Sequence, residues 1–366
     1  MRFECNRTKM EESINIVLKA IPVRTTMPVL ECMVVKAVNG VITLTTNDMN
    51  LGIETSFDAD VAEDGIVLVN AKMLSDVVRK FDSDEFHFAA DDEYRITLTS
   101  GSSKFHLSGI DSDEFPMLPQ MDKNHKITIS QMTLRDMINQ TIFSISKNEN
   151  NKIITGELFE ITGDKFMIAS LDLHRVSQRI VRLKESYDNT KVVIPGKALT
   201  ELSKILQGGV DDEMEIYFSE NHALFEFDRT ILITQLIEGN YYNVDQMMSN
   251  EYETKVTINR MEFYNSLDRS TLLNRESENQ PIVLHINDQD LNLDMNTKMG
   301  SMNDKISITK EGKDLDISFS SKYLMDVLKV LDLEEVTMYL VNSRSPVFIK
   351  DDETYNYLIL PISMQG

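Results

Sequence analysis

Asp172 and His174 are the residues whose types and spacing come closest to a catalytic or metal-binding pair. If they lie on a β-strand, both side chains face the same side of the sheet, a spacing compatible with two metal ligands. No third ligand stands nearby in the sequence, so we predict no metal site and no cofactor. His174 alone is equally compatible with a partly buried, hydrogen-bonded histidine and with a residue that contacts a ligand.

Other catalytic motifs are missing from the sequence. The pair Gly208-Gly209 lacks the strand, the spacing and the lysine of a phosphate-binding loop, so we interpret it as a turn. Cys5 and Cys32 form no CxxC pair, and no segment resembles a nucleophile elbow. We therefore predict that the protein is not an enzyme. The alternative is an acidic multidomain enzyme with a site at a domain junction around Asp172 and His174.

Basic residues recur in two columns with a separation of 125 residues, although only about one residue in ten is basic. The first column is Lys72, Lys197 and Lys322, and the second is Arg79, Lys204 and Lys329. At about 100° per helical residue, both columns lie about 150° from the apolar position of Leu74, so they face away from the core. The alternative is a solvated helix with internal ion pairs, because acidic residues recur at Asp76, Glu201 and Asp326.

The charge balance restricts how a nucleic acid could bind. The 366-residue chain has 59 acidic and 37 basic residues and a formal net charge of −22, so its surface as a whole should repel nucleic acid and anionic membranes. Any contact with nucleic acid must therefore be local. The N-terminus is charged where a signal peptide would be apolar, and no apolar stretch approaches the ~18 residues that span a bilayer. We expect a cytoplasmic protein that does not contact a membrane.

A threefold repeat positions the basic columns. Residues 69–81, 194–206 and 319–331 align without gaps, and each segment ends a strand-like run and enters a helix with apolar residues at i, i+3 and i+7. An alternating strand near residues 3, 127 and 256 opens each repeat and precedes a second helix. The predicted caps of these second helices are Asn6, Ser130 and Asn259.

The segments between the helices alternate as antiparallel strands do. Residues 34–44, with Asn39-Gly40 at the centre, predict a β-hairpin with a type I′ turn, and residues 160–167 and 284–293 repeat the arrangement. Each repeat is therefore an α+β domain of two helices packed on antiparallel sheet. The connectors place the three domains at residues 1–122, 123–250 and 251–366.

The size of these domains has a geometric consequence. A domain of about 125 residues is about 35 Å across when treated as a sphere. Three such spheres enclose a hole of about 5 Å and six enclose one of about 35 Å, whereas a DNA duplex is about 20 Å wide. Six domains can surround duplex DNA but three cannot, and a head-to-tail homodimer would close such a ring.

Six short segments are specific in combination, although none is a strong motif alone. They are Arg24-Thr25-Thr26-Met27-Pro28-Val29-Leu30, Asp113-Glu114-Phe115-Pro116-Met117-Leu118, Phe143-Ser144-Ile145-Ser146, Asp172-Leu173-His174-Arg175, Val193-Ile194-Pro195-Gly196-Lys197 and Tyr357-Leu358-Ile359-Leu360-Pro361-Ile362. In this order, the chain resembles the bacterial DNA polymerase III beta subunit family, the sliding clamps. The resemblance implies a homodimeric ring around double-stranded DNA that tethers the replicative polymerase and catalyses nothing.

The resemblance also implies a pocket between the second and third domains. It would take short peptide motifs containing glutamine, leucine and phenylalanine from polymerases, the clamp loader and repair proteins. The implied lining is Ile154, Leu171, Leu173, His174, Arg175, Val176, Tyr242, Met247, Tyr323, Pro346, Leu358, Ile359, Leu360, Pro361 and Ile362. Because Pro361 has no amide hydrogen to donate, we expect Ile362 and its neighbours to leave the sheet.

This lining departs from the family pattern. The usual Thr-Asp-Gly-His-Arg is residues 171–175 here, with leucine at the first and third positions, and the usual Gly-Arg-Phe-Pro-Asp-Tyr is residues 239–244. Asp245-Gln246 stands where basic residues normally follow, and Ser363 stands where an arginine is expected. We expect the pocket to keep its apolar character despite these departures.

Two further sets of residues follow from the repeat and the resemblance. The expected DNA-facing residues are Lys72, Arg79, Lys197, Lys204, Lys322 and Lys329, with Arg24, Lys147 and Lys152 on loops. The expected dimer contacts are Phe105 and Leu107 on an edge strand, with Leu272 and Leu273 at the end of a helix. The alternative is that these four apolar residues are ordinary core residues.

Overall fold

The computed structural model describes residues 1–124, 126–248, 251–274, 280–351 and 354–362. The chain forms two compact units, Met1–Thr133 with Glu201–Leu236, and Leu134–Thr200 with Ile237–Gly366. Helices α3 (Gln131–Thr141) and α4 (Gly196–Ile205) both extend across the division between these units. The second repeat therefore contributes residues to both units.

Unit 1 contains two antiparallel sheets. Its helical segments are α1 (Arg7–Val17), η1 (Leu18–Ala20), η2 (Pro28–Glu31) and α2 (Ala71–Arg79). Five strands form a sheet in the order β5 (Asp60–Glu63), β1 (Arg2–Asn6), β7 (Glu85–Ala90), β8 (Arg95–Ser100) and β9 (Ser103–Ser108). Eight strands form the other in the order β10 (Ile127–Ser130), β13 (Glu213–Phe218), β14 (His222–Phe227), β15 (Thr230–Gln235), β4 (Leu51–Asp58), β3 (Val41–Asn47), β2 (Cys32–Val38) and β6 (Gly65–Asn70). The pairing of β15 with β4 joins the first two repeats in one sheet.

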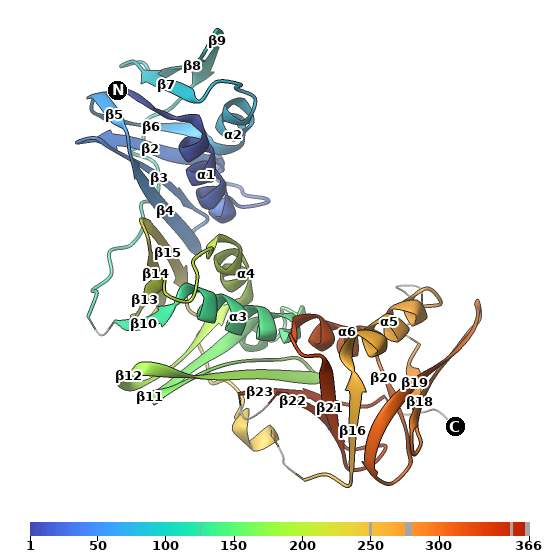
Figure 1. The fold of residues 1–366 in the computed structure, drawn as a ribbon. Coiled ribbons are helices and arrows are strands. Elements are labelled where there is room, and N and C mark those ends of the chain that lie inside the picture. Colours follow the sequence, from blue (N-terminus) through green and yellow to red (C-terminus); the bar gives the residue numbers. More distant parts are fainter. Residues whose placement is uncertain (125, 249–250, 275–279, 352–353, 363–366) are drawn as a thin grey trace. The chain divides into compact units, whose positions relative to one another are not determined.

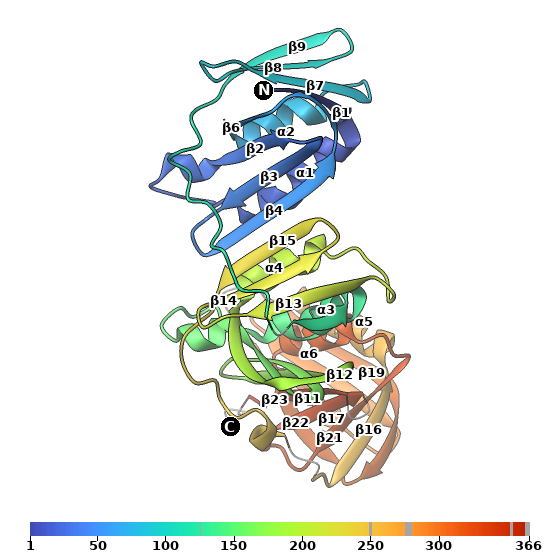
Figure 2. The same ribbon diagram turned by 90° about the vertical axis from the view of Figure 1, so that its left-hand side faces the viewer.

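Helices α1 and α2 lie side by side over one face of the strands of the first repeat (Figures 1 and 2). Helix α1 packs on β3 and β4, and α2 packs on β2 and β6. Ile14 on α1 and Leu74 and Val78 on α2 are fully buried. Lys72 and Arg79 are exposed, as the helical periodicity predicts.

Unit 2 contains one ten-stranded sheet that joins the second and third repeats. The strand order is β11 (Gly156–Leu171), β12 (Arg175–Pro195), β23 (Tyr355–Ile359), β22 (Val347–Asp351), β21 (Glu335–Leu340), β16 (Thr254–Asn259), β19 (Gly300–Gly312), β18 (Asp290–Thr297), β17 (Ile282–Ile286) and β20 (Leu315–Phe319). Its helical segments are η3 (Ile142–Ser144), η4 (Lys152–Thr155), η5 (Asp245–Met247), α5 (Arg260–Thr271) and α6 (Ser321–Val330). The pairing of β12 with β23 carries the sheet from the second repeat to the third.

The predicted helix starts and the first hairpin are confirmed. The Asn6 side chain accepts the amide of Thr8 at 2.9 Å, and the Asn259 side chain accepts that of Glu262 at 3.0 Å. Ser130 Oγ accepts the amide of Thr133 at 3.4 Å. Asn39 and Gly40 have φ values of 53° and 80°, the left-handed conformation that a type I′ turn requires at both positions.

The hairpin predicted at residues 160–167 is wrong, whereas the one at 284–293 is confirmed as β17 and β18. Strand β11 continues through this region because both of its halves pair with the longer β12, Glu160 opposite Lys191 and Lys165 opposite Arg182. Gly163, with a φ of 61°, lies where the register shifts on both sides. The extra residues at these shifts belong to β12, so Gly163 lies within one continuous strand, opposite an irregularity of β12, and is not the turn between two strands.

Candidate functional site

The segment Asp172–His174 is the turn between β11 and β12, so the expectation that its side chains share the face of a strand is wrong. Asp172 Oδ1 accepts the amides of His174 at 2.7 Å and Arg175 at 3.0 Å. Asp172 Oδ2 accepts Arg175 Nε at 3.1 Å. Both oxygens of Asp172 therefore hold the turn. Within the described residues, no group of three or more histidine, cysteine, aspartate or glutamate side chains could hold a metal ion.

Arg175 links this turn to the third repeat. Its side chain is only 6% exposed, and besides Asp172 it contacts Asp326 Oδ2 on α6, at 2.7 Å from Nη1. Its Nη2 donates to the carbonyl oxygen of Phe143 at 2.5 Å, and its guanidinium lies 4.3 Å from the centre of the Tyr323 ring. Arg175 forms ion pairs with two carboxylates, Asp172 in the turn and Asp326 on α6. These pairs stabilise the position of the turn.

His174 and Leu173 remain on the outside of the turn. His174 is exposed, and its ring stacks on that of Tyr323 with 5.8 Å between the ring centres. The Leu173 side chain is 74% exposed. An exposed leucine near the stack of an exposed histidine on a half-buried tyrosine has the mixed character of a surface that binds side chains of a partner.

Four of the expected pocket residues belong to one buried apolar cluster. Ile154, Leu171, Val176 and Leu358 pack together, and Met247 packs against them. The strand register explains this grouping, because Val176 lies opposite both Leu171 on β11 and Leu358 on β23. Segments nearly 200 residues apart in sequence therefore form the apolar floor beside the turn.

Ile359 does not belong to this cluster. It is fully buried among the core residues of the third repeat, since neighbouring side chains of β23 face opposite sides of the sheet. Leu358 and Ile359 therefore cannot line the same pocket, and the inclusion of Ile359 is wrong. Pro346 is half-buried in the loop before β22.

Sequence reasoning missed Tyr241. Its side chain is 7% exposed and packs in the same apolar cluster, whereas the expected Tyr242 is 46% exposed and its hydroxyl accepts Asn151 Nδ2 at 3.3 Å. The other buried members of the cluster that were missed are Leu158, Met167, Ala169, Val193, Val244 and Phe348. The repeat held no signal for Tyr241, because the residue 125 positions earlier is Pro116.

The C-terminal segment leaves the sheet as expected. Strand β23 ends at Ile359, and the amide of Leu360 donates to the carbonyl oxygen of His174 at 2.8 Å. The amide of Ile362 donates to Ser318 at 2.8 Å. Leu360 and Ile362 are 38% and 37% exposed, and Pro361 between them is half-buried. Ser363 lies outside the described residues.

All nine expected DNA-facing residues are exposed. They are Arg24, Lys72, Arg79, Lys147, Lys152, Lys197, Lys204, Lys322 and Lys329. Lys152 opens the short helix η4 and does not lie on a loop. The alternative of ion pairs within each helix is seen in the second repeat, where Lys204 Nζ lies 2.8 Å from Glu201 Oε1. In the third repeat Asp326 pairs instead with Arg175.

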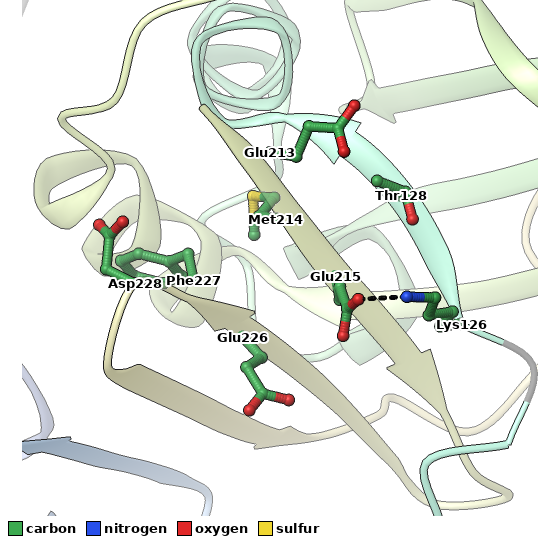
Figure 3. A pocket seen from close by; sticks show the side chains of 8 residues that line it. All are labelled: Lys126, Thr128, Glu213, Met214, Glu215, Glu226, Phe227 and Asp228. Atoms are coloured by element: carbon green, nitrogen blue, oxygen red, sulfur yellow. Dashed lines mark hydrogen bonds and ion pairs between the residues drawn. The ribbon is translucent and has the colours of Figure 1, made fainter. Parts of the chain in front are cut away.

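Carboxylates gather on the sheet in unit 1. Along β13, Met214 and Ile216 are buried in the core, so Glu213 and Glu215 point to the opposite face. Glu226 on β14 lies opposite Glu215, as Figure 3 shows with the ion pair of 2.5 Å from Lys126 to Glu215. Hydrogen bonds from the Lys126 ammonium and the Tyr217 hydroxyl lower the pKa of Glu215, which keeps it charged.

The expected dimer contacts lie at an edge and at a helix end. Phe105 and Leu107 are on β9, the edge strand of the five-stranded sheet, and Phe105 is 42% exposed. Leu272 follows the last turn of α5 and is 80% exposed, whereas Leu273 is half-buried against the core of the third repeat. Phe105 and Leu272 are therefore not ordinary core residues.

None of the helices in the described part of the chain is long and apolar enough to cross a membrane.

The family models of the DNA polymerase III beta subunit match residues 1–119 as the N-terminal domain, 128–243 as the central domain and 245–363 as the C-terminal domain.

Relatives match along the whole chain. The beta sliding clamp of Staphylococcus epidermidis is 32% identical, with 99% of both chains covered. The crystal structure of the DNA polymerase sliding clamp from Bacillus subtilis has a TM-score of 0.95 at 31% identity, with both chains fully covered. A crystal structure from Eubacterium rectale, assigned as a DNA polymerase III beta subunit, has a TM-score of 0.94 at 45% identity over 99% of each chain. The chain belongs to the DNA polymerase III beta subunit family and is a sliding clamp, a processivity factor of DNA replication.

Proposed function

We propose that the chain acts in the cytoplasm as a ring-shaped homodimer that encircles duplex DNA and holds the replicative polymerase on it. The observation that carries the proposal is the recurrence of exposed basic residues at matching positions of the repeated helices in a clamp of net charge −22. The ring catalyses no reaction, and the enzyme alternative loses its support because both oxygens of Asp172 hold a turn.

The basic helices would bind the DNA backbone. Lysine and arginine bind phosphates without reading the base sequence, and exposed side chains bind them weakly enough for a clamp to slide. The carboxylates of the sheet in unit 1 would repel DNA from that face. The ring would therefore hold the duplex inside it and not on its outer surface.

Ring closure would use the first domain of one chain and the third domain of another, with the domains at residues 1–122, 123–250 and 251–366. An edge strand such as β9 has backbone groups available to pair with another chain. The exposed side chains of Phe105 and Leu272 would gain free energy from burial at such a contact. A head-to-tail arrangement closes after two chains.

Partner proteins would dock by short peptides on the surface beside the Asp172–His174 turn. The buried apolar cluster and the exposed Leu173, Leu360 and Ile362 offer contacts for leucine and phenylalanine side chains. Burying two such side chains contributes roughly 3–6 kcal/mol before ordering costs, which favours exchangeable, micromolar binding. Polymerases, the clamp loader and repair proteins could therefore use one site in turn.

Light scattering and DNA retention test the proposal. The particle should have a mass of about 84 kDa, twice the chain's 41.9 kDa. After loading, it should stay on nicked circular DNA and be lost when the DNA is linearised, because a ring slides off a free end. A monomer, or a protein retained equally on linear DNA, would contradict the ring.

A further inference from the structure

A cavity of about 190 Å³ lies in unit 1, where strand β15 of the second repeat pairs with β4 of the first. The turn between β3 and β4, the end of β15 and the first connector form its walls. Among its lining residues are Asn47, Met49, Asn50, Gly52, Met117 and Gln235. The sequence analysis assigned no binding role to any of them.

The strand register around this cavity repeats that of the proposed docking surface beside the Asp172–His174 turn. Gly52 on β4 lies opposite one residue of each neighbouring strand, Asn47 on β3 and Ile233 on β15. Val176 on β12 lies opposite residues of β11 and β23 in the same way. The register therefore makes Gly52 the counterpart of Val176, which belongs to the apolar cluster of the docking surface.

The turns beside the two sites are held by the same hydrogen bonds. Asp48 Oδ1 accepts the amides two and three residues later, at 3.0 Å and 2.8 Å, as Asp172 Oδ1 does in unit 2. The amide of Gln235 donates to the carbonyl oxygen of Asn50 at 2.9 Å, and the amide of Leu360 makes the corresponding bond in unit 2. The cavity is therefore the counterpart, one repeat earlier, of the proposed peptide site.

The lining of the cavity combines apolar side chains with unpaired polar ones. Met49, in the place of Leu173, is 50% exposed, and Met117 of the connector is 56% exposed. The side chains of Asn50 and Gln235 make no hydrogen bond within the described residues. None of the described lining residues is a lysine, an arginine, an aspartate or a glutamate. This chemistry suits an uncharged peptide, whereas a DNA phosphate would find no lysine or arginine to bind.

The chain itself shows how this junction holds an extended segment. Asn47 Nδ2 donates to the carbonyl oxygen of Pro116 in the connector at 2.8 Å. Leu118 fills the space above Gly52, because a Cβ atom on this glycine would overlap Leu118 Cδ2. One hydrogen bond to the backbone and one leucine therefore fix the connector. The cavity beside it has room for one further aliphatic side chain, since about 150 Å³ is enough for benzene.

We propose that this cavity is a second peptide-binding site of the clamp, which takes one aliphatic side chain of an extended, uncharged segment. The inference rests on the proposed peptide docking, because the surface beside the Asp172–His174 turn is its counterpart. Since one side chain is buried in place of two, the second site should bind roughly 30-fold more weakly. It would serve a partner that another contact already tethers to the clamp, because tethering raises the effective concentration.

Photo-crosslinking to the full-length protein tests the second site. The probe is the peptide Gln-Leu-Pro-Gln with blocked ends and a photo-reactive leucine, and mass spectrometry locates the crosslinks. We expect crosslinks at Met117 in unit 1 and at Leu173 in unit 2. The peptide containing glutamine, leucine and phenylalanine, at a concentration that just saturates the site in unit 2, should remove the crosslinks at Leu173. Those at Met117 should remain, because the second site binds this peptide more weakly.

Two matched variants identify the cavity. Met49→Glu places a carboxylate at the uncharged rim and should reduce crosslinking at Met117 at least tenfold, while crosslinking at Leu173 stays unchanged. Met73→Glu is the control, because Met73 on α2 is similarly exposed and does not line the cavity. This control should leave both sets of crosslinks unchanged.

The outcomes separate the second site from the proposed function. If the peptide containing glutamine, leucine and phenylalanine does not bind the unmodified protein at all, peptide docking itself is refuted. If it binds but the probe leaves no crosslinks in unit 1, only the second site is overturned. Crosslinks at Met117 that persist undiminished in Met49→Glu would place the probe outside this cavity and also overturn the second site.

Discussion

Glu157 on β11 should make the stability of this clamp decrease as the pH rises. Its side chain is fully buried, and neither carboxyl oxygen has a hydrogen-bond partner in the described part of the chain. The nearby hydroxyl of Thr141 donates to the carbonyl oxygen of Met137 at 2.8 Å. Burial therefore raises the pKa of Glu157 well above its ordinary value of 4.5.

The sign of the pH effect follows from proton linkage. The folded chain binds this proton more tightly than the unfolded chain, so the stability is fully present below pH 4.5 and is lost as the pH rises toward the folded pKa. Each pH unit in that interval costs about 1.4 kcal/mol of the free energy of unfolding. Since pH 7 lies 2.5 units above 4.5, the loss at pH 7 is at most about 3.4 kcal/mol.

Glu157→Gln keeps the size of the side chain and does not titrate, so it should remove this pH dependence. The free energy of unfolding, measured with urea at intervals from pH 5 to pH 8, should show a growing advantage of the variant over the unmodified chain. Glu157→Met removes the unpartnered oxygens as well and should stabilise the protein by a further 1–3 kcal/mol or so.

Glu160→Gln is the matched control for Glu157. Glu160 lies on the same strand, but its carboxylate pairs with Lys191 at 2.9 Å and is partly exposed. Its variant should keep the pH dependence of the unmodified chain. If Glu157→Gln also keeps that dependence, Glu157 is not held neutral in the folded state and the reasoning from burial is refuted.

Three further predictions concern assembly and binding. Replacing Leu272 and Leu273 by aspartate should place unpaired charge at the subunit contact and yield folded monomers by light scattering; a folded variant that stays dimeric would contradict the assignment. Replacing Lys197 and Lys204 by glutamate should reduce retention on nicked circular DNA, and its salt dependence, without changing the dimer; unchanged retention would argue against DNA contact by these helices. Deleting residues 360–366 should abolish binding of a fluorescent clamp-motif peptide while the dimer persists, and unchanged affinity would exclude this placement of the site.

Local chemistry allowed the sequence to determine the repeat and much of its secondary structure. The helix caps at Asn6 and Asn259 and the turn at Asn39-Gly40 depend only on residues close to them in the sequence. A local sequence pattern can therefore predict them. The exposure of Lys72 also follows from local helical periodicity. The sequence also determined the family, because six short segments match those of the family in the same order along the whole chain.

The tertiary structure alone decided how distant strands meet. Gly163 lies within a continuous strand because β12 is long enough to pair with both halves of β11. Leu358 joined the apolar cluster and Ile359 the core of the third repeat, because the pairing of β23 sets which face each side chain occupies. The burial of Glu157 likewise depends on segments far from it in sequence. Local sequence patterns cannot show which strands will pair or which segments will cover a side chain, because register and burial arise only when separate segments pack together.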